Sequence, residues 1–323
     1  NSMIKSGSAA AWISQSIGTN TIPFMPHDPP PRIDRSQFVS GDDCSHHSSV
    51  WPASIDCDFQ RTAAGKTALV RLSHQGPLRI QKLFHDGELA HCYVLHPPGG
   101  MVSGDSLQSR FKVNPGAKVL ITTPASGKLY QARQNQIPQR ASTYIDVTSD
   151  GFCAHLPQDT IVFDQAFGEL ETFVNVDSRA LFFGWEHLIF GRRAGGHPFE
   201  NGQLIQSLRV SREDRLLFRE NLRLTPQTVN AVSGLNGMVS FASVTVVLPM
   251  NSGTTSDVVS VARESLKSFD VHSGVSAIRE CLITVRILSG VEEETKSALE
   301  QLWTAIGPKL VDRPVASPRI WRT

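Results

Sequence analysis

Pro77-Leu78-Arg79-Ile80-Gln81-Lys82-Leu83-Phe84 is the stretch that first indicates the fold class. Apolar residues recur in it at about every second position, which is the period of a β-strand with one buried face. Apolar runs rich in β-branched residues precede and follow it, at residues 67–72 and 90–95, and Asp86-Gly87 marks a turn. The three segments predict a succession of short strands.

The same pattern continues along most of the chain. Turn residues such as Asn114-Pro115-Gly116 and Asp150-Gly151 separate the later segments. These segments cover residues 106–113, 119–123, 143–147, 152–156, 160–164, 170–176, 180–186, 204–210, 215–223, 238–248 and 281–288. Many short strands with turn chemistry between them predict an all-β fold resembling a β-helix or a sandwich.

Two helices are predicted near the C-terminus, over residues 257–267 and 291–306. Ser289 and Glu292 have the spacing of a capping box at the start of the second helix. Apolar residues at helical spacing form a stripe along this helix, and Gly307-Pro308 is expected to end it. We interpret the stripe as core packing, with a partner surface as the alternative.

Residues 1–58 differ from the rest in being rich in proline and serine and in lacking apolar periodicity. We expect them to form a disordered or loosely attached arm, and residues 59–323 to form the β domain. A soft metal ion is one possible ligand of the arm's side chains, and a solvated tail without a role is the alternative. The side chains concerned are His27, Cys44, His46, His47 and Cys57.

Charge and cysteine usage narrow the function classes. The chain has 31 basic and 30 acidic residues, which argues against sequence-independent nucleic-acid binding and against a polybasic membrane anchor. It contains no apolar run of the length of ~18 residues that a membrane-spanning helix needs, and its first residues do not resemble a secretory signal. Its five cysteines include no C-x-x-C pair, so we expect reduced thiols and a cytoplasmic protein.

Motifs of catalysis are incomplete in this sequence. Gly65-Lys66-Thr67 resembles the end of a phosphate-binding loop, but Gln60 stands where that motif requires its first glycine. Neither a G-x-S-x-G nucleophile elbow nor an H-E-x-x-H metal helix occurs. We therefore predict that the protein is not an enzyme.

Two carboxylates stand out as candidates for cation binding. Asp105 ends the glycine-rich stretch that begins at His96, which we expect to form a hairpin loop. Asp105, assisted by His96, is either a cation ligand or an acceptor for backbone amides of the turn, and the sequence leaves both open. Glu186 lies in an apolar setting, where a carboxylate must be paired, metal-bound or protonated; an ion pair with Arg192 or Arg193 is the structural explanation.

Six stretches, taken in order, resemble the UreD (UreH) family of urease accessory proteins over roughly residues 60–323. They are Gln75-Gly76-Pro77-Leu78, the glycine-rich 96–105, the T-T-P element at 122–130, the L-P-Q element at 156–166, Trp185-Glu186 with Gly191-Arg192, and Pro318-Arg319-Ile320-Trp321-Arg322-Thr323. No single stretch would be specific, but the series is.

The resemblance implies a non-enzymatic scaffold in the complex that delivers nickel to apo-urease, through a channel inside the UreD-type subunit. The implied partners are a helical adaptor (UreF type), a GTPase (UreG type) and apo-urease, and nickel(II) would bind only transiently. Asp105 and Glu186 are the first candidates for the channel and His197 is the third, since the family usually has a glutamate near that position. Glu169 and Glu171 are weaker candidates, with solvated charges as the alternative.

Arg319 and Trp321 are tentative partner-binding residues, because arginine and tryptophan are frequent interface anchors; Trp321 in the core is the alternative. Two other functions remain as rivals. A ligand-binding β-sandwich without a urease role predicts exposed aromatic residues on a concave face, and aromatic residues make up only 7% of the chain. A hydrolase predicts a nucleophile and a base that converge.

Overall fold

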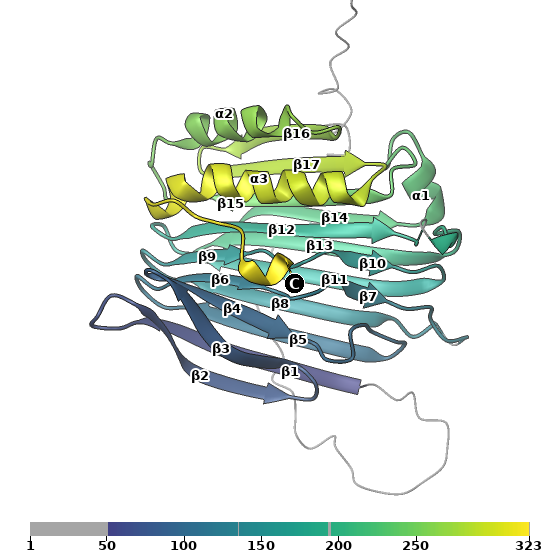
Figure 1. Cartoon of the computed structure of the whole chain (residues 1–323), viewed down its shortest axis with the longest axis horizontal. Helices are drawn as coiled ribbons and strands as arrows, with labels where there is room; N and C mark the ends of the chain where they lie inside the picture. Colours follow the sequence, from purple (N-terminus) through teal and green to yellow (C-terminus); the bar gives the residue numbers. More distant parts are fainter. Residues whose placement is uncertain (1–50, 135, 193–194, 323) are drawn as a thin grey trace, which may run out of the picture. The chain divides into compact units, whose positions relative to one another are not determined.

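The computed structural model describes residues 51–134, 136–192 and 195–322. In this part of the chain seventeen strands form two sheets, and three α-helices and a final 3-10 helix complete the fold. The prediction of a mostly β protein with helices near its C-terminus is thus confirmed (Figure 1). Within the described ranges, no helix has the length and apolarity that crossing a membrane requires.

Sheet A contains seven strands in the spatial order β14-β13-β11-β8-β5-β1-β2. Their bounds are β1 (Trp51–Arg61), β2 (Thr67–Gln75), β5 (Asp105–Val113), β8 (Gln139–Val147), β11 (Ala166–Val176), β13 (Gly202–Arg212) and β14 (Arg215–Leu224).

Sheet B contains ten strands, eight of them in the order β16-β17-β15-β12-β9-β6-β4-β3, while β10 pairs with β12 and β7. Their bounds are β3 (Arg79–Asp86), β4 (Leu89–Leu95), β6 (Lys118–Thr122), β7 (Gly127–Leu129), β9 (Phe152–His155), β10 (Thr160–Val162), β12 (Leu181–Phe190), β15 (Ser240–Val247), β16 (His272–Arg279) and β17 (Leu282–Ser289).

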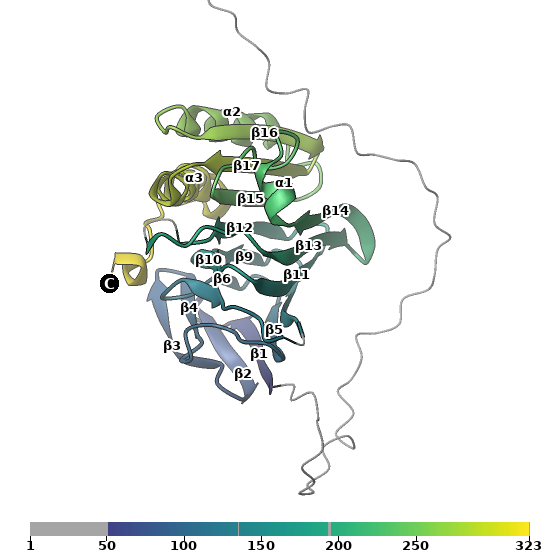
Figure 2. The same cartoon turned by 90° about the vertical axis from the view of Figure 1, so that its right-hand side faces the viewer.

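The chain passes repeatedly from one sheet to the other between β4 and β13 (Figures 1 and 2). In sheet A, β1, β5, β8, β11 and β13 pair in parallel, as do β4, β6, β9 and β12 in sheet B. Each coil of the chain therefore adds strands to both sheets, as in a β-helix. Antiparallel hairpins extend the sheets at their ends, for example β1–β2 and β13–β14.

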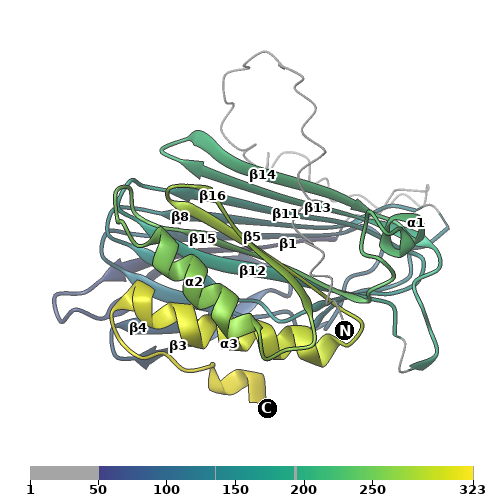
Figure 3. The same cartoon turned by 90° about the horizontal axis from the view of Figure 1, so that it is seen from above.

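Period-two alternation sets which side chains lie between the sheets. In β1, Ala53, Ile55 and Phe59 are buried, while the intervening Ser54 and Asp56 are only half-buried. A second apolar layer forms on the outer face of sheet B, where the helices α2 (Thr255–Leu266) and α3 (Glu292–Val311) pack on β12, β15, β16 and β17 (Figure 3). The short α1 (Pro226–Asn230) follows β14, and the 3-10 helix η4 (Arg319–Arg322) ends the described chain.

The first described strand, β1, starts at Trp51 and pairs in sheet A, so residues 51–58, which the sequence assigned to the arm, are part of the sheet. The inward residues of β1 do alternate, but Pro52 and the polar segment before it obscure the pattern in the sequence. Cys57 belongs to this strand and is buried, and burial raises the pKa of its thiol to about 12, which makes it a poor metal ligand. The other four residues that could hold a metal ion in one of the two interpretations of the arm, and the arm up to residue 50, lie outside the described residues.

Three local predictions need correction. The glycine-rich segment at 96–104 is a crossover from β4 in sheet B to β5 in sheet A, not a hairpin loop. The helix α3 continues past Gly307-Pro308 to Val311, because Leu310 and Val311 are buried in the core, and it ends where Asp312 takes a left-handed conformation. No capping box forms at its start, since Val291 is the N-cap and Ser289 Oγ accepts a hydrogen bond from the Val291 N–H.

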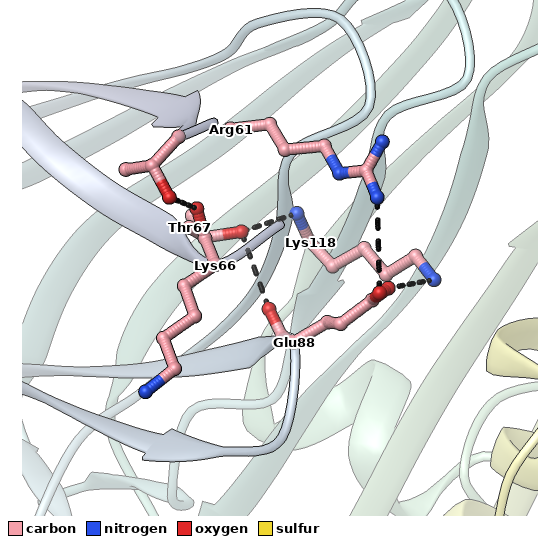
Figure 4. A network of polar contacts seen from close by, with 6 residues as sticks. Arg61, Lys66, Thr67, Glu88 and Lys118 are labelled. Atoms are coloured by element: carbon pink, nitrogen blue, oxygen red, sulfur yellow. Dashed lines mark hydrogen bonds and ion pairs between the residues drawn. The ribbon is translucent and has the colours of Figure 1, made fainter. Parts of the chain in front are cut away.

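The segment that resembles a phosphate loop has a structural role (Figure 4). Thr67 opens β2, and its Oγ1 accepts from the Lys118 N–H at 2.8 Å and donates to the Glu88 carbonyl at 3.3 Å. The Glu88 carboxylate also pairs with Lys118 Nζ at 2.8 Å and Arg61 Nη2 at 3.8 Å. A strand rather than a helix follows Gly65-Lys66-Thr67, so there is no helix N-terminus to hold a phosphate.

Candidate functional site

A partly polar cavity lies between the two sheets. Its smaller chamber, of about 180 Å³, is lined by Ser109, Thr143 and Thr172 of sheet A and by Ile121, His155 and Glu186 of sheet B, among others. A larger chamber, of about 240 Å³, is lined by the glycine-rich segment and by Lys128 and Leu129, and it shares Ser109 and Thr143 with the smaller one. The two chambers are therefore neighbouring parts of one inter-sheet space.

Glu186 projects from β12 toward sheet A. Its carboxylate accepts hydrogen bonds from Thr172 Oγ1 on β11 and from Gln206 Nε2 on β13. Desolvation by burial raises its pKa from 4.5 to about 6, the two hydrogen bonds oppose this shift, and the nearby Glu220 carboxylate adds to it. The alternative explanation of Glu186, an ion pair with Arg192, is not realised: the Arg192 guanidinium lies over the Phe163 ring, and Arg193 is outside the described residues.

Further polar groups continue from Glu186 along the space between the sheets. Glu220 of β14 accepts from Ser243 Oγ of β15 at 2.9 Å and forms an ion pair with Arg286 of β17. Gln206 Oε1 and Arg286 Nη1 are buried without a hydrogen-bond partner in the described chain. Buried polar atoms without partners are uncommon, so this part of the interior is suited to water or to a polar guest.

The glycine-rich segment closes one side of the larger chamber. A side chain at Gly100 would meet the Tyr130 ring, because an added Cβ would lie 2.4 Å from its Cε2 atom. His96 lines this chamber, and burial lowers the pKa of its imidazole against the opposing effect of Asp105. Asp105 Oδ2 accepts from the Val102 N–H at 2.8 Å, so the turn-bonding alternative for this carboxylate is realised.

Asp105, Glu186 and His197 do not form a joint site. His197 is exposed on the β12–β13 connection, where its backbone pairs with that of Arg192. Throughout the described ranges, no group of three or more His, Cys, Asp or Glu side chains is placed to hold a metal ion. Of the three predicted residues, Glu186 alone lines the inter-sheet cavity. Glu169 is on the outer face of sheet A in an ion pair with Arg140, and Glu171 is exposed but also borders the smaller chamber.

Trp321 is a core residue, as in the alternative considered from the sequence. It is 8% exposed, its Nε1 donates to Thr122 Oγ1 at 2.8 Å, and its ring centroid lies 5.7 Å from that of Trp185. Arg319 on the same turn is exposed. Trp321 therefore serves packing in the core, and of the two residues predicted to bind a partner only Arg319 is exposed. The contacts of Trp321 hold the tail against sheet B.

One serine and one histidine do converge. His187 Nε2 lies 2.8 Å from Ser240 Oγ, and burial lowers the pKa of this imidazole to about 4. Ser240 is fully buried, so no substrate can reach its hydroxyl. The pair is therefore structural and does not support a hydrolase.

Sequence reasoning missed Gln206, Glu220 and His155. A signal for the first two was present: Gln206 stands between Leu204 and Leu208, and Glu220 occupies an inward position of β14. Polar residues at inward positions of a strand mark a polar interior. His155 ends β9, where no local pattern distinguishes it, and burial lowers the pKa of its imidazole to about 4.

Comparison with known proteins finds the same family over nearly all of the described chain. A family model described as UreD urease accessory protein matches residues 52–322. The chain is 34% identical to the urease accessory protein UreD of Methylobacillus flagellatus over 278 residues, covering 84% of this chain and 95% of that protein. It is 33% identical to UreD of a Marinomonas species (85% and 91% covered) and 31% identical to UreD 1 of Psychrobacter cryohalolentis (93% and 98% covered).

Proposed function

The chain belongs to the family of UreD urease accessory proteins, and on that premise we propose that it passes nickel(II) to apo-urease through the cavity between its sheets. Its role is urease maturation. The observation that carries the nickel step is the position of Glu186, a carboxylate in the inter-sheet cavity whose hydrogen-bond partners are the neutral Thr172 and Gln206. Because no basic side chain neutralises it, it attracts a divalent cation.

The chemistry of the cavity suits transit better than storage. Nickel(II) accepts carboxylate, imidazole and neutral oxygen ligands. Glu186 and the neutral imidazole of His155 offer two such donors in the smaller chamber, surrounded by the hydroxyl groups of Ser109, Thr143 and Thr172. Conduction requires sites weak enough to release the ion, so a few scattered donors suit it. His96 in the larger chamber extends the series of donors.

Membership of the family supports a proposed assembly with other proteins of urease maturation. The protein acts as a non-catalytic scaffold in the cytoplasm, together with a helical adaptor of the UreF type, a nickel-carrying GTPase of the UreG type and apo-urease. GTP hydrolysis comes from the GTPase. The rival of a ligand-binding β-sandwich without a urease role loses its support, because the family match extends over residues 52–322.

The test is urease activation in cells that carry the cognate urease operon with this gene deleted and then restored. Urease activity and urease nickel content are read together for the intact chain, for Glu186→Gln and for the control Glu293→Gln, an exposed acid on α3. We expect the intact chain and the control to restore both readouts, and Glu186→Gln to lower nickel content while the variant still assembles with its partners. Normal nickel content with Glu186→Gln would contradict the route through this chamber. Failure of the intact chain would contradict the role itself.

A further inference from the structure

Two arginines project from the edge strand β14 on the outer face of sheet A. Arg219 and Arg223 alternate with the inward Glu220 and Leu222, and both are exposed. The long helices α2 and α3 pack on sheet B, so this face of sheet A lies on the side away from them (Figure 3).

Two arginines stand opposite each other in the register of β13 and β14 on this face. Arg219 stands directly opposite Arg209 of β13. Like charges in directly opposed cross-strand positions destabilise a sheet. Arg215, Arg219 and Arg223 are absent from the ion pairs formed within the described part of the chain, and Arg223 Nε donates to the neutral Gln203 Oε1 at 2.9 Å.

Two acidic side chains of sheet A pair with arginines of strands other than β13 and β14. Glu169 is engaged by Arg140 at 2.6 Å, and Asp56 lies 4.0 Å from Arg110. Glu171 accepts a hydrogen bond from Ser142. The charge of Arg219 and Arg223 on β14 is thus not offset by an ion pair within the described part of the chain, and it is available to an external partner.

An aromatic pair lies beside the arginines. The Tyr144 and Phe173 rings stack at 4.9 Å with an interplanar angle of 7°, and Phe173 is the register partner of Arg209. Arg110 lies over the Tyr144 ring at 5.2 Å. The residues in register across β5, β8, β11, β13 and β14 are Arg110, Tyr144, Phe173, Arg209 and Arg219. Half-exposed aromatic residues next to arginines are typical of the energetically dominant part of a protein interface.

We infer that this face docks an acidic segment of a protein partner, with Arg219 and Arg223 pairing with its carboxylates and the Tyr144–Phe173 pair supporting an apolar residue between them. Arginine favours such contacts because its planar guanidinium binds a carboxylate with two parallel hydrogen bonds. A nucleic acid would also stack on aromatic rings, but sequence-independent binding to its phosphates needs a large excess of basic groups, whereas this chain has 31 basic and 30 acidic residues. The inference rests on the proposed function only for the choice of proteins to be tested.

The experiment places a photo-crosslinking amino acid at Asn221, which is exposed between Arg219 and Arg223, in the full chain expressed with its cognate urease operon. The crosslinked peptide is identified by mass spectrometry. In parallel, complexes with apo-urease and with each accessory protein are titrated for the intact chain, for Arg219→Glu/Arg223→Glu and for a control with the same charge change, Lys66→Glu/Lys309→Glu, at exposed sites away from this face. A milder Arg219→Gln/Arg223→Gln variant covers the case in which charge reversal impairs folding.

We expect an adduct with a peptide rich in aspartate and glutamate, and a loss of affinity for that protein of about tenfold or more in the charge-reversal variant, with less loss in the control. Binding of the intact chain should weaken as salt is raised. A crosslink to nucleic acid, a crosslinked peptide without acidic residues, or unchanged affinity in both arginine variants would overturn the inference. Complexes that form without an adduct at Asn221 would overturn it too and leave the proposed function intact, whereas the absence of any complex with the intact chain would count against that function.

Discussion

Replacement of Glu186 by glutamine is expected to stabilise the fold at neutral pH and to alter its pH dependence. Ionised Glu186 lies in the cavity without a cationic neighbour, and burial raises its pKa from 4.5 to about 6. The isosteric glutamine keeps the shape and removes the charge. Its new amide group can donate to Gln206 after a flip of that side chain, because Gln206 Oε1 has no hydrogen-bond partner in the described chain.

The size of the effect follows from the two pKa values. A difference of about 1.5 between the unfolded and folded pKa corresponds to about 2 kcal/mol, at about 1.36 kcal/mol for each tenfold change in proton affinity. Because the folded pKa is the higher one, the folded state binds the proton more tightly. This contribution to stability is therefore fully present below pH ~4.5 and is lost as the pH rises through about 6.

Buried histidines act in the opposite direction over part of the same range. Burial lowers the pKa of His155 and of His187 to about 4, so the folded state loses stability relative to the unfolded state as the pH falls below ~6.5. The stability of one protein alone therefore does not isolate Glu186. The difference between wild type and Glu186→Gln does, because the histidines contribute equally to both.

The assay is urea unfolding followed by tryptophan fluorescence at pH 4.5, 6 and 7.5, for wild type and for Glu186→Gln. At each pH, the free energy of unfolding of wild type is subtracted from that of the variant. This difference should be about 2 kcal/mol larger at pH 7.5 than at pH 4.5. Parallel stability curves for the two proteins would refute the reasoning. They would mean that Glu186 is not desolvated, or that a cation already compensates its charge.

Three further predictions test the packing. Trp321→Ala should lower the free energy of unfolding by about 3–5 kcal/mol, because it empties a core position and leaves Thr122 without its donor, whereas Arg319→Ala should change it by less than about 0.5 kcal/mol in the same urea titration. Gly168→Ala should cost about 1–3 kcal/mol in thermal or urea unfolding, because the added Cβ would lie 2.5 Å from Leu129 Cδ1; no loss would show that the cavity wall can yield. Asp312→Gly should raise stability by a few tenths to about 1 kcal/mol in differential scanning calorimetry, since Asp312 holds φ 54° at the end of α3, and a lowered transition would contradict this account of the cap.

Local patterns predicted most strands because alternation is a property of short segments. The prediction failed for three strands. β7 has only three residues, and β1 begins beside a proline. Every residue of β16 is exposed or half-exposed, so its sequence does not alternate between a buried and an exposed face. The length of α3 was underestimated for another reason. Glycine and proline usually end a helix, but burial of Leu310 and Val311 in the tertiary core outweighs that preference.

Part of the candidate site could be predicted from the sequence, and part could not. Glu186 was identifiable from the sequence, because a carboxylate among apolar strand residues needs compensation wherever it lies. Its partners were not, because Thr172 and Gln206 belong to strands of the opposite sheet. The role of Asp105 was left open by composition and was decided by the path of the 96–104 crossover, which brings the Val102 amide to its carboxylate.

By itself, the sequence determined the β character of the chain, its family and the residues that face inward along most strands, because each depends on order and spacing along the chain. Only the tertiary structure decided which inward residues meet: that Glu186 lies against Thr172 and Gln206, that Trp321 fills the core, and that Arg209 faces Arg219. The physical reason is that alternation sets the face on which a side chain lies, whereas its neighbours depend on how the coils of the chain stack and in which register the strands pair.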